Sequence, residues 1–87
     1  SGYGGYIGKV VTYLDTVNIT VVNDTKGIKI AWNKVEGATG YRVYKRAKGT
    51  SAWSEVASVD GNTLSVNDSA ITSGVVYEYA KVKRYGG

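Results

Sequence analysis

The amino-acid sequence predicts an all-β fold, either a β-sandwich or a small barrel, for a single small domain. Apolar and polar residues alternate with period two in several short segments, and no stretch of useful length has the period of an amphipathic helix. Turn-forming residues separate these segments at intervals of roughly 8 to 12 residues, as in sandwiches and barrels. The aromatic residues include eight tyrosines, and tyrosine fits the half-buried surface of a sheet.

The first clear strand is predicted at residues 27–32, GIKIAW. Successive side chains of a strand point to opposite faces, so Ile28, Ile30 and Trp32 share one face. We expect this apolar face to be buried in the core of the domain.

A second strand is predicted at residues 41–46, YRVYKR, after a loop of small and polar residues. Tyr41 and Val43 are expected to face inward, with the intervening side chains facing outward. The outward residues are Arg42, Tyr44 and Arg46. Because Trp32 precedes the loop and Tyr41 follows it, we expect both rings to be packing residues.

Three further strands are predicted at residues 52–59, 62–66 and 75–85. Asp60 and Gly61 end the first of these, and Asn67 and Asp68 end the second. These residue types favour tight turns. We therefore interpret Asp60 and Asp68 as turn formers rather than as ligands of a metal ion.

The order of these motifs resembles a fibronectin type III domain of the kind found in secreted and surface bacterial proteins. The shared features are a tryptophan that ends one strand, a glycine-containing loop, the segment GYRVYKR, and a Tyr-x-Tyr strand that begins at Tyr77. The resemblance covers about residues 18–85. It implies a sandwich with Trp32 in the core and Tyr77 at a corner, with Ile71 and Gly74 in the corner turn. The expected core consists of Ile28, Ile30, Trp32, Tyr41, Val43, Ile71 and Tyr77.

One segment departs from the family pattern. In YEYAKVK, Val82 lies three positions after Tyr79, so strict alternation would place these two side chains on opposite faces. We expect a β-bulge near Ala80 and Lys81, because one extra residue would return Val82 to the inward face.

The composition argues against an enzyme. The chain has no cysteine and no histidine, which removes thiolate chemistry and the commonest metal ligand. The carboxylates are scattered through turns and strand ends, whereas glycosidase chemistry needs a facing pair. No apolar run approaches the roughly 20 residues of a membrane span. We therefore expect a non-enzymatic domain with no cofactor, no metal site and no membrane span.

The formal net charge of +4 admits an anionic partner. If the strands at 41–46 and 75–85 are neighbours, their outward side chains would combine basic residues with an exposed tyrosine, which suits an anionic polymer. The residues of this face are Arg42, Tyr44, Arg46 and Lys81. The alternative function is thus an accessory glycan- or cell-wall-binding module of a secreted hydrolase or adhesin. A solvated outer surface is the simpler interpretation of the same residues.

The two ends of the sequence lead to the preferred hypothesis. A type III domain has seven strands, and the sixth is followed here only by YGG. Residues 6–14, YIGKVVTYL, have the alternation of an additional strand. We divide the chain into residues 1–16, a Gly-rich segment with a donor-like last strand, and residues 17–87, a domain with the first six strands. The connector between the two parts is too short for ordinary antiparallel closure onto the sixth strand of the same domain.

We therefore expect the N-terminal strand to complete a neighbour by strand donation, as an extracellular or cell-surface structural module. Such a head-to-tail contact propagates into a fibre or a repeat array when it does not close into a ring. The expected partners are copies of the chain or adjacent repeats, with an anionic polysaccharide as the alternative and no nucleic acid. Val10 and Leu14 are expected to face inward. The full donation interface is Ile7, Val10, Val11, Tyr13, Leu14, Tyr79 and Val82. A free subunit, one repeat of a longer chain and an engineered permutant all remain open.

Overall fold

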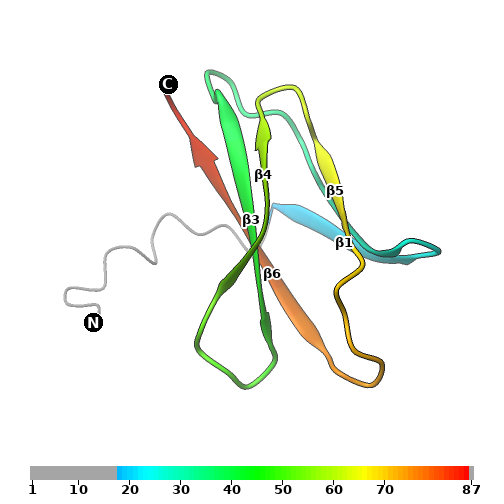
Figure 1. Ribbon diagram of the computed structural model, residues 1–87. Coiled ribbons are helices and arrows are strands. Elements are labelled where there is room, and N and C mark those ends of the chain that lie inside the picture. Colours follow the sequence, from blue (N-terminus) through cyan, green and yellow to red (C-terminus); the bar gives the residue numbers. More distant parts are fainter. Residues whose placement is uncertain (1–17, 87) are drawn as a thin grey trace.

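The computed structural model describes residues 18–86, which form two antiparallel sheets of three strands each (Figure 1). The first sheet has the order β1-β2-β5, with β1 at Ile19–Asp24, β2 at Gly27–Trp32 and β5 at Ser65–Asp68. The second has the order β4-β3-β6, with β4 at Ser54–Asp60, β3 at Gly40–Ala47 and β6 at Tyr77–Arg84. No helix occurs in the part of the chain that the structure describes. The predicted all-β class is therefore confirmed.

Strands β1 and β2 form a hairpin in continuous register, from Ile19 opposite Trp32 to Asp24 opposite Gly27. The turn needs a glycine, because Gly27 has a φ of 114° and a Cβ there would lie 2.2 Å from the backbone oxygen of Asp68. The hairpin places the beginning of β1 beside the end of β2. That position matters for the candidate site.

Five buried apolar side chains form one cluster to which both sheets contribute. Its members are Ile30, Trp32, Tyr41, Val43 and Tyr79. The rings of Trp32 and Tyr41 pack with centroids 5.3 Å apart and an interplanar angle of 56°. The Tyr41 hydroxyl also accepts a hydrogen bond of 2.9 Å from the backbone N–H of Val35, in the loop between β2 and β3. The two rings that flank this loop therefore join the two sheets.

Other residues expected in the core lie at its margin or outside it. Ile28 and Tyr77 are partly buried and pack against the cluster. Ile71 stays 37% exposed, because it lies in the loop between β5 and β6 and not on a strand that faces the core. Tyr79 is the β6 residue that reaches the cluster, although the sequence placed it in the donation interface.

The loop before β6 is held by the residue expected at the corner. The Tyr77 hydroxyl accepts a hydrogen bond of 3.0 Å from the backbone N–H of Thr72. Gly74 has a φ of 85°, and the N–H of Val75 donates to the Thr72 carbonyl at 3.2 Å. A hydroxyl that bonds the backbone a few residues upstream is the contact made by a tyrosine corner.

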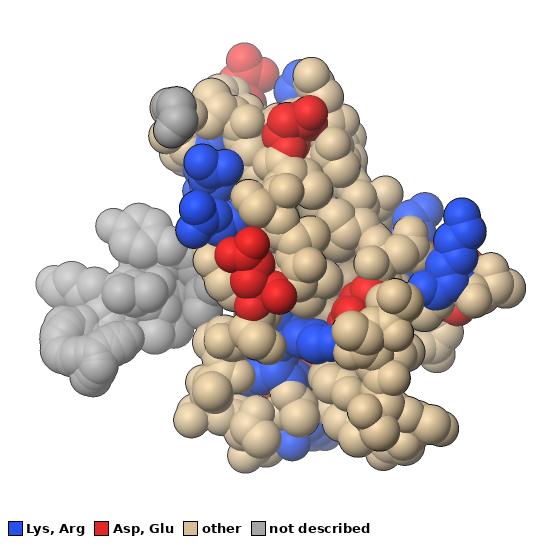
Figure 2. Space-filling model, viewed as in Figure 1, with Lys and Arg blue, Asp and Glu red and all other residues tan. Residues whose placement is uncertain are grey.

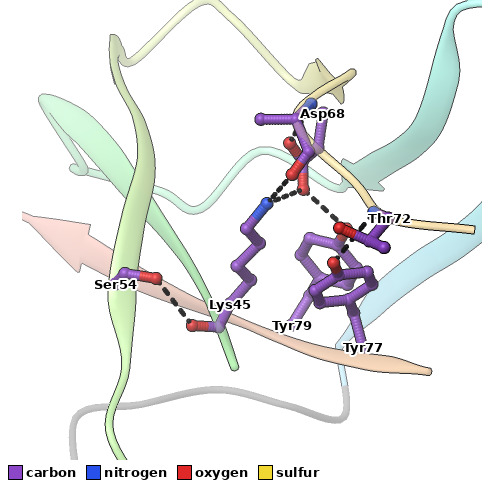
Figure 3. A network of polar contacts seen from close by, with 7 residues as sticks. Lys45, Ser54, Asp68, Thr72, Tyr77 and Tyr79 are labelled. Atoms are coloured by element: carbon purple, nitrogen blue, oxygen red, sulfur yellow. Dashed lines mark hydrogen bonds and ion pairs between the residues drawn. The ribbon is translucent and has the colours of Figure 1, made fainter. Parts of the chain in front are cut away.

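A polar network joins the two sheets next to this corner (Figure 3). Asp68, only 3% exposed at the end of β5, accepts hydrogen bonds from the Tyr79 hydroxyl (2.7 Å) and from Lys45 Nζ (3.0 Å). A third bond, from the N–H of Ala70, is 3.1 Å long. Burial alone would raise the pKa of Asp68, but the three hydrogen bonds outweigh it and lower that pKa. Asp68, predicted as a turn former, thus links β5 to both β3 and β6.

Strand β6 pairs with β3 in continuous register along its whole length. The expectation of a bulge near Ala80 is therefore wrong. A register shift occurs instead in the pairing of β3 with β4, between Val43 and Tyr44. This shift lies on the other side of β3, so it leaves the alternation of β6 intact.

Uninterrupted alternation corrects the expected position of Lys81. Lys81 is opposite Val43 on the inner face and is 2% exposed, so it does not belong to the outer basic face. Its Nζ lies 5.7 Å from the centroid of the Tyr41 ring, a favourable cation–π arrangement. Val82 is opposite Arg42 and lies on the outer face, where it is partly buried.

Candidate functional site

Strands β1 and β6 border the same opening on one side of the molecule. Each lies at the edge of its sheet, since within residues 18–86 β1 has only β2 and β6 has only β3 as a neighbour. Two pockets lie here, and residues of both strands line each of them. We call this region between β1 and β6 the seam. An edge strand turns part of its backbone N–H and C=O groups away from its partner, so β6 can pair with a further strand in the seam.

The Tyr77 pocket, of about 420 Å³, lies along the first half of β6. Tyr77 and Tyr79 line it from the inner face of β6, whereas Glu78 lines it from the outer face. Ile19 and Val21 of β1 also form part of its wall. Arg46 and Trp53 line it on the outer face, next to Glu78, so residues of both faces of the sheet border this one pocket along β6. It therefore has the location of a strand position next to β6.

The Lys83 pocket, of about 510 Å³, lies along the second half of β6. Lys81 and Lys83 line it together with Asn18 and Thr20, near the beginning of β1. Trp32 also lines this pocket, and its buried Nε1 has no hydrogen-bond acceptor among the described residues. Lysine ammonium and indole N–H groups are donors only. This half of the seam therefore favours an occupant that is rich in hydrogen-bond acceptors, such as an extended backbone.

Sequence reasoning missed the β1 side of the seam. Ile19 and Val21 lie two apart and face the seam, yet Val21 remains 44% exposed. The available signal was the apolar run at Val21 and Val22, which alternation does not explain. Nothing in the local sequence shows that this edge and the β6 edge face one another.

The predicted donation residues fall into two groups. Tyr79 lines the Tyr77 pocket from the inner face, and Val82 lies on the outer face of β6. The others lie outside the described residues, so the structure does not place them: Ile7, Val10, Val11, Tyr13 and Leu14.

The predicted basic face is divided between the two faces of the sheet. Arg42 is exposed and Tyr44 partly buried on the outer face, whereas Lys81 is on the inner face. Arg46 Nε lies 2.8 Å from a carboxylate oxygen of Glu78, and its guanidinium carbon lies 4.3 Å from the centroid of the Trp53 ring. Basic and acidic side chains are interspersed over the surface seen in Figure 2. The structure therefore does not unite the four residues into one anionic-ligand site.

The described residues contain no group of three or more potential metal-binding side chains from His, Cys, Asp and Glu. In the same part of the chain, no helix is long and apolar enough to cross a membrane. The most strongly perturbed titratable group is Tyr79, whose pKa is raised by burial and by its bond to Asp68. This pair belongs to the polar network that joins the two sheets, and Tyr79 also lines the Tyr77 pocket.

Comparisons with known proteins add no assignment. No family model matches the chain, and neither the curated proteins nor the solved structures give a match. The described residues thus define an all-β fold, with two antiparallel three-stranded sheets and the seam between two of their edges.

Proposed function

We propose that the chain is a non-enzymatic extracellular structural module that assembles head-to-tail by strand donation into a fibre or a repeat array. The observation that carries the proposal is the Tyr77 pocket, which has the location of a strand position beside β6. The strand orders β1-β2-β5 and β4-β3-β6 also support a fibronectin type III sandwich, because they agree with six of its strands, and within residues 18–86 no strand lies on the free edge of β6.

The proposed occupant is the segment of residues 6–14, antiparallel to β6. In one register Val10 and Leu14 face inward, so that Val10 lies opposite Lys81 and Leu14 opposite Tyr77. The register shifted by one residue would turn Lys9 inward, beside the inner-face lysines of β6. Like charges opposite one another destabilise a sheet, so the first register is favoured. Its backbone carbonyls would also supply hydrogen-bond acceptors to the Lys83 pocket.

The strand is donated to another copy because of where β1 begins. Asn18 lines the same pocket as Lys83, so the chain joins β1 beside the second half of β6. An antiparallel partner of β6 ends at the opposite end, beside Tyr77. Residues 14–18 span at most about 14 Å, whereas the distance back along β6 from Tyr77 to Lys83 is about 20 Å. Each copy therefore fills the seam of a neighbour more easily than its own.

A matched pair of variants tests the proposal. Val10→Lys adds a cation to the inward face beside Lys81, whereas Val11→Lys adds the same side chain to the outward face. We expect Val10→Lys to abolish concentration-dependent association in light scattering, with Val11→Lys close to the unmodified chain. Appending YIGKVVTYL after Gly87 should give a monomer, since each seam is then filled from within.

Two results would contradict the proposal. If the unmodified chain is monomeric at high concentration, with residues 6–14 protected against its own β6, strand donation between copies is excluded. Equal effects of the Val10 and Val11 substitutions would exclude the proposed register.

A further inference from the structure

The loop of residues 69–76, between β5 and β6, exposes several apolar side chains. Ile71 is 37% exposed, Val75 42% and Val76 63%, and no other large apolar side chain in residues 18–86 is as exposed as Val76. We call these three residues the corner patch. The loop leads directly into the Tyr77 end of β6, close to the loop that follows β3 (Figure 1).

The corner patch belongs to a firmly held loop. The Thr72 N–H donates to the Tyr77 hydroxyl, and the Val75 N–H donates to the Thr72 carbonyl. The Val76 carbonyl accepts a hydrogen bond of 2.8 Å from the N–H of Lys48, in the loop after β3. A fixed loop that exposes apolar surface is pre-organised for contact with another protein surface.

The chain path of strand donation identifies that surface. A donated strand antiparallel to β6 ends beside Tyr77, next to the corner patch. Residues 14–18 then reach at most about 14 Å before β1 of the donor begins. The folded body of the donor must therefore lie against the end of the acceptor that carries the corner patch.

We propose that the corner patch docks the folded body of the copy that donates the strand; this inference rests on the proposed function. The facing end of the donor is the end where its β1 begins. There the Leu64 side chain is 36% exposed, and the Leu64 carbonyl accepts a hydrogen bond from the Trp32 N–H, opposite Ile19. An apolar contact between this end and the corner patch fixes the angle between successive units, so the fibre is stiff and not a freely jointed chain.

The test separates the docking contact from the strand itself. Val75→Thr together with Val76→Thr keeps the shape of both side chains at exposed positions and removes apolar contact. We expect the dissociation constant of full-chain association, from sedimentation velocity over a concentration series, to rise about tenfold. A fluorescent peptide of residues 6–14 has no folded body, so its affinity for the seam, from titration with excess peptide that displaces full-chain association, should be the same for the variant and the unmodified chain. The matched control is Val22→Thr, on β1 and 47% exposed, which should alter neither measurement.

Three results would overturn the docking contact. Unchanged full-chain association of the double variant would exclude it and leave strand donation standing. An equal loss of peptide and full-chain affinity would place the effect in the seam and not at the corner patch. A wild-type chain that stays monomeric and binds no peptide would remove strand donation, and the docking contact with it.

Discussion

The two faces of the sheet β4-β3-β6 contain similar residue types but bury them differently. On the inner face, Lys45 reaches across to Asp68 of the other sheet, and the side chains of this pair are 17% and 4% exposed. On the outer face, Arg46 pairs with Glu78 of the neighbouring strand, and these side chains are 31% and 41% exposed. Both are ion pairs at hydrogen-bonding distance. The second sheet keeps water away from the inner pair, whereas the outer pair is in contact with solvent.

This comparison shows what decides whether a charged residue can be buried. A buried charge is tolerated when its partner is fixed nearby, and removal of that partner is costly. An exposed pair contributes little, because water screens both charges. Substitutions on the two faces should therefore have unequal effects, even when the residue types are the same.

The largest expected effect separates the two tryptophans. Trp32 is 6% exposed in the core, and its replacement by alanine should lower the free energy of unfolding by about 3 to 5 kcal/mol. Trp53 is partly exposed under Arg46 on the outer face, and its replacement by alanine should lower the free energy of unfolding by only about 1 kcal/mol. Urea denaturation followed by circular dichroism measures both. A cooperative transition of Trp32→Ala close to that of the unmodified chain would contradict the inner-face assignment.

The next effect concerns the inner ion pair. Asp68→Ala leaves Lys45 without its carboxylate and Tyr79 without its acceptor, so we expect a loss of about 3 kcal/mol. Lys45→Met should lower the free energy of unfolding by less than half as much, because Asp68 keeps its hydrogen bonds from Tyr79 and Ala70. The same denaturation measurement compares the two variants. Equal losses would show that the lysine, and not the tyrosine, holds the carboxylate in place.

The smallest effect is a dependence on pH. The pKa of Tyr79 is raised above its ordinary value of 10.0, so the folded chain keeps this proton at pH values where the unfolded chain has lost it. Stability from this group is thus present below about pH 10 and declines as the pH rises further. Tyr79→Phe should make the alkaline decline of the unfolding free energy shallower. An unchanged alkaline slope would indicate that the decline comes from other residues.

The period-two alternation was sufficient for the fold class and for most of the core. Ile30, Trp32, Tyr41 and Val43 lie on strands with one clearly apolar face, and that face is buried. Ile71 could not be placed in the same way, because its segment forms a loop with no alternation to constrain it. The expectation of a corner at Tyr77 came from the family resemblance and not from the pattern itself.

The inner face of β6 could not be derived from its sequence. A single residue of register exchanges the two faces of a strand, and lysine is rarely fully buried. The position of Lys81 becomes understandable only with the Tyr41 ring 5.7 Å away, a contact between neighbouring strands. The seam could not be derived from the sequence either, because it lies between β1 and β6, two edge strands that are far apart in the sequence.

The β1–β2 hairpin has a mechanical consequence for a chain under tension. A force applied at the beginning of β1 acts first on Ile19, and the component along the strand pulls along its axis. The six residues of β1 are in register with β2, and antiparallel hydrogen bonds lie across that axis. A pull along this axis therefore loads the bonds in shear so that they share the force, whereas a pull that separates Ile19 from Trp32 across the axis would open them one after another. The hairpin thus resists a pull along β1 better than a pull across it.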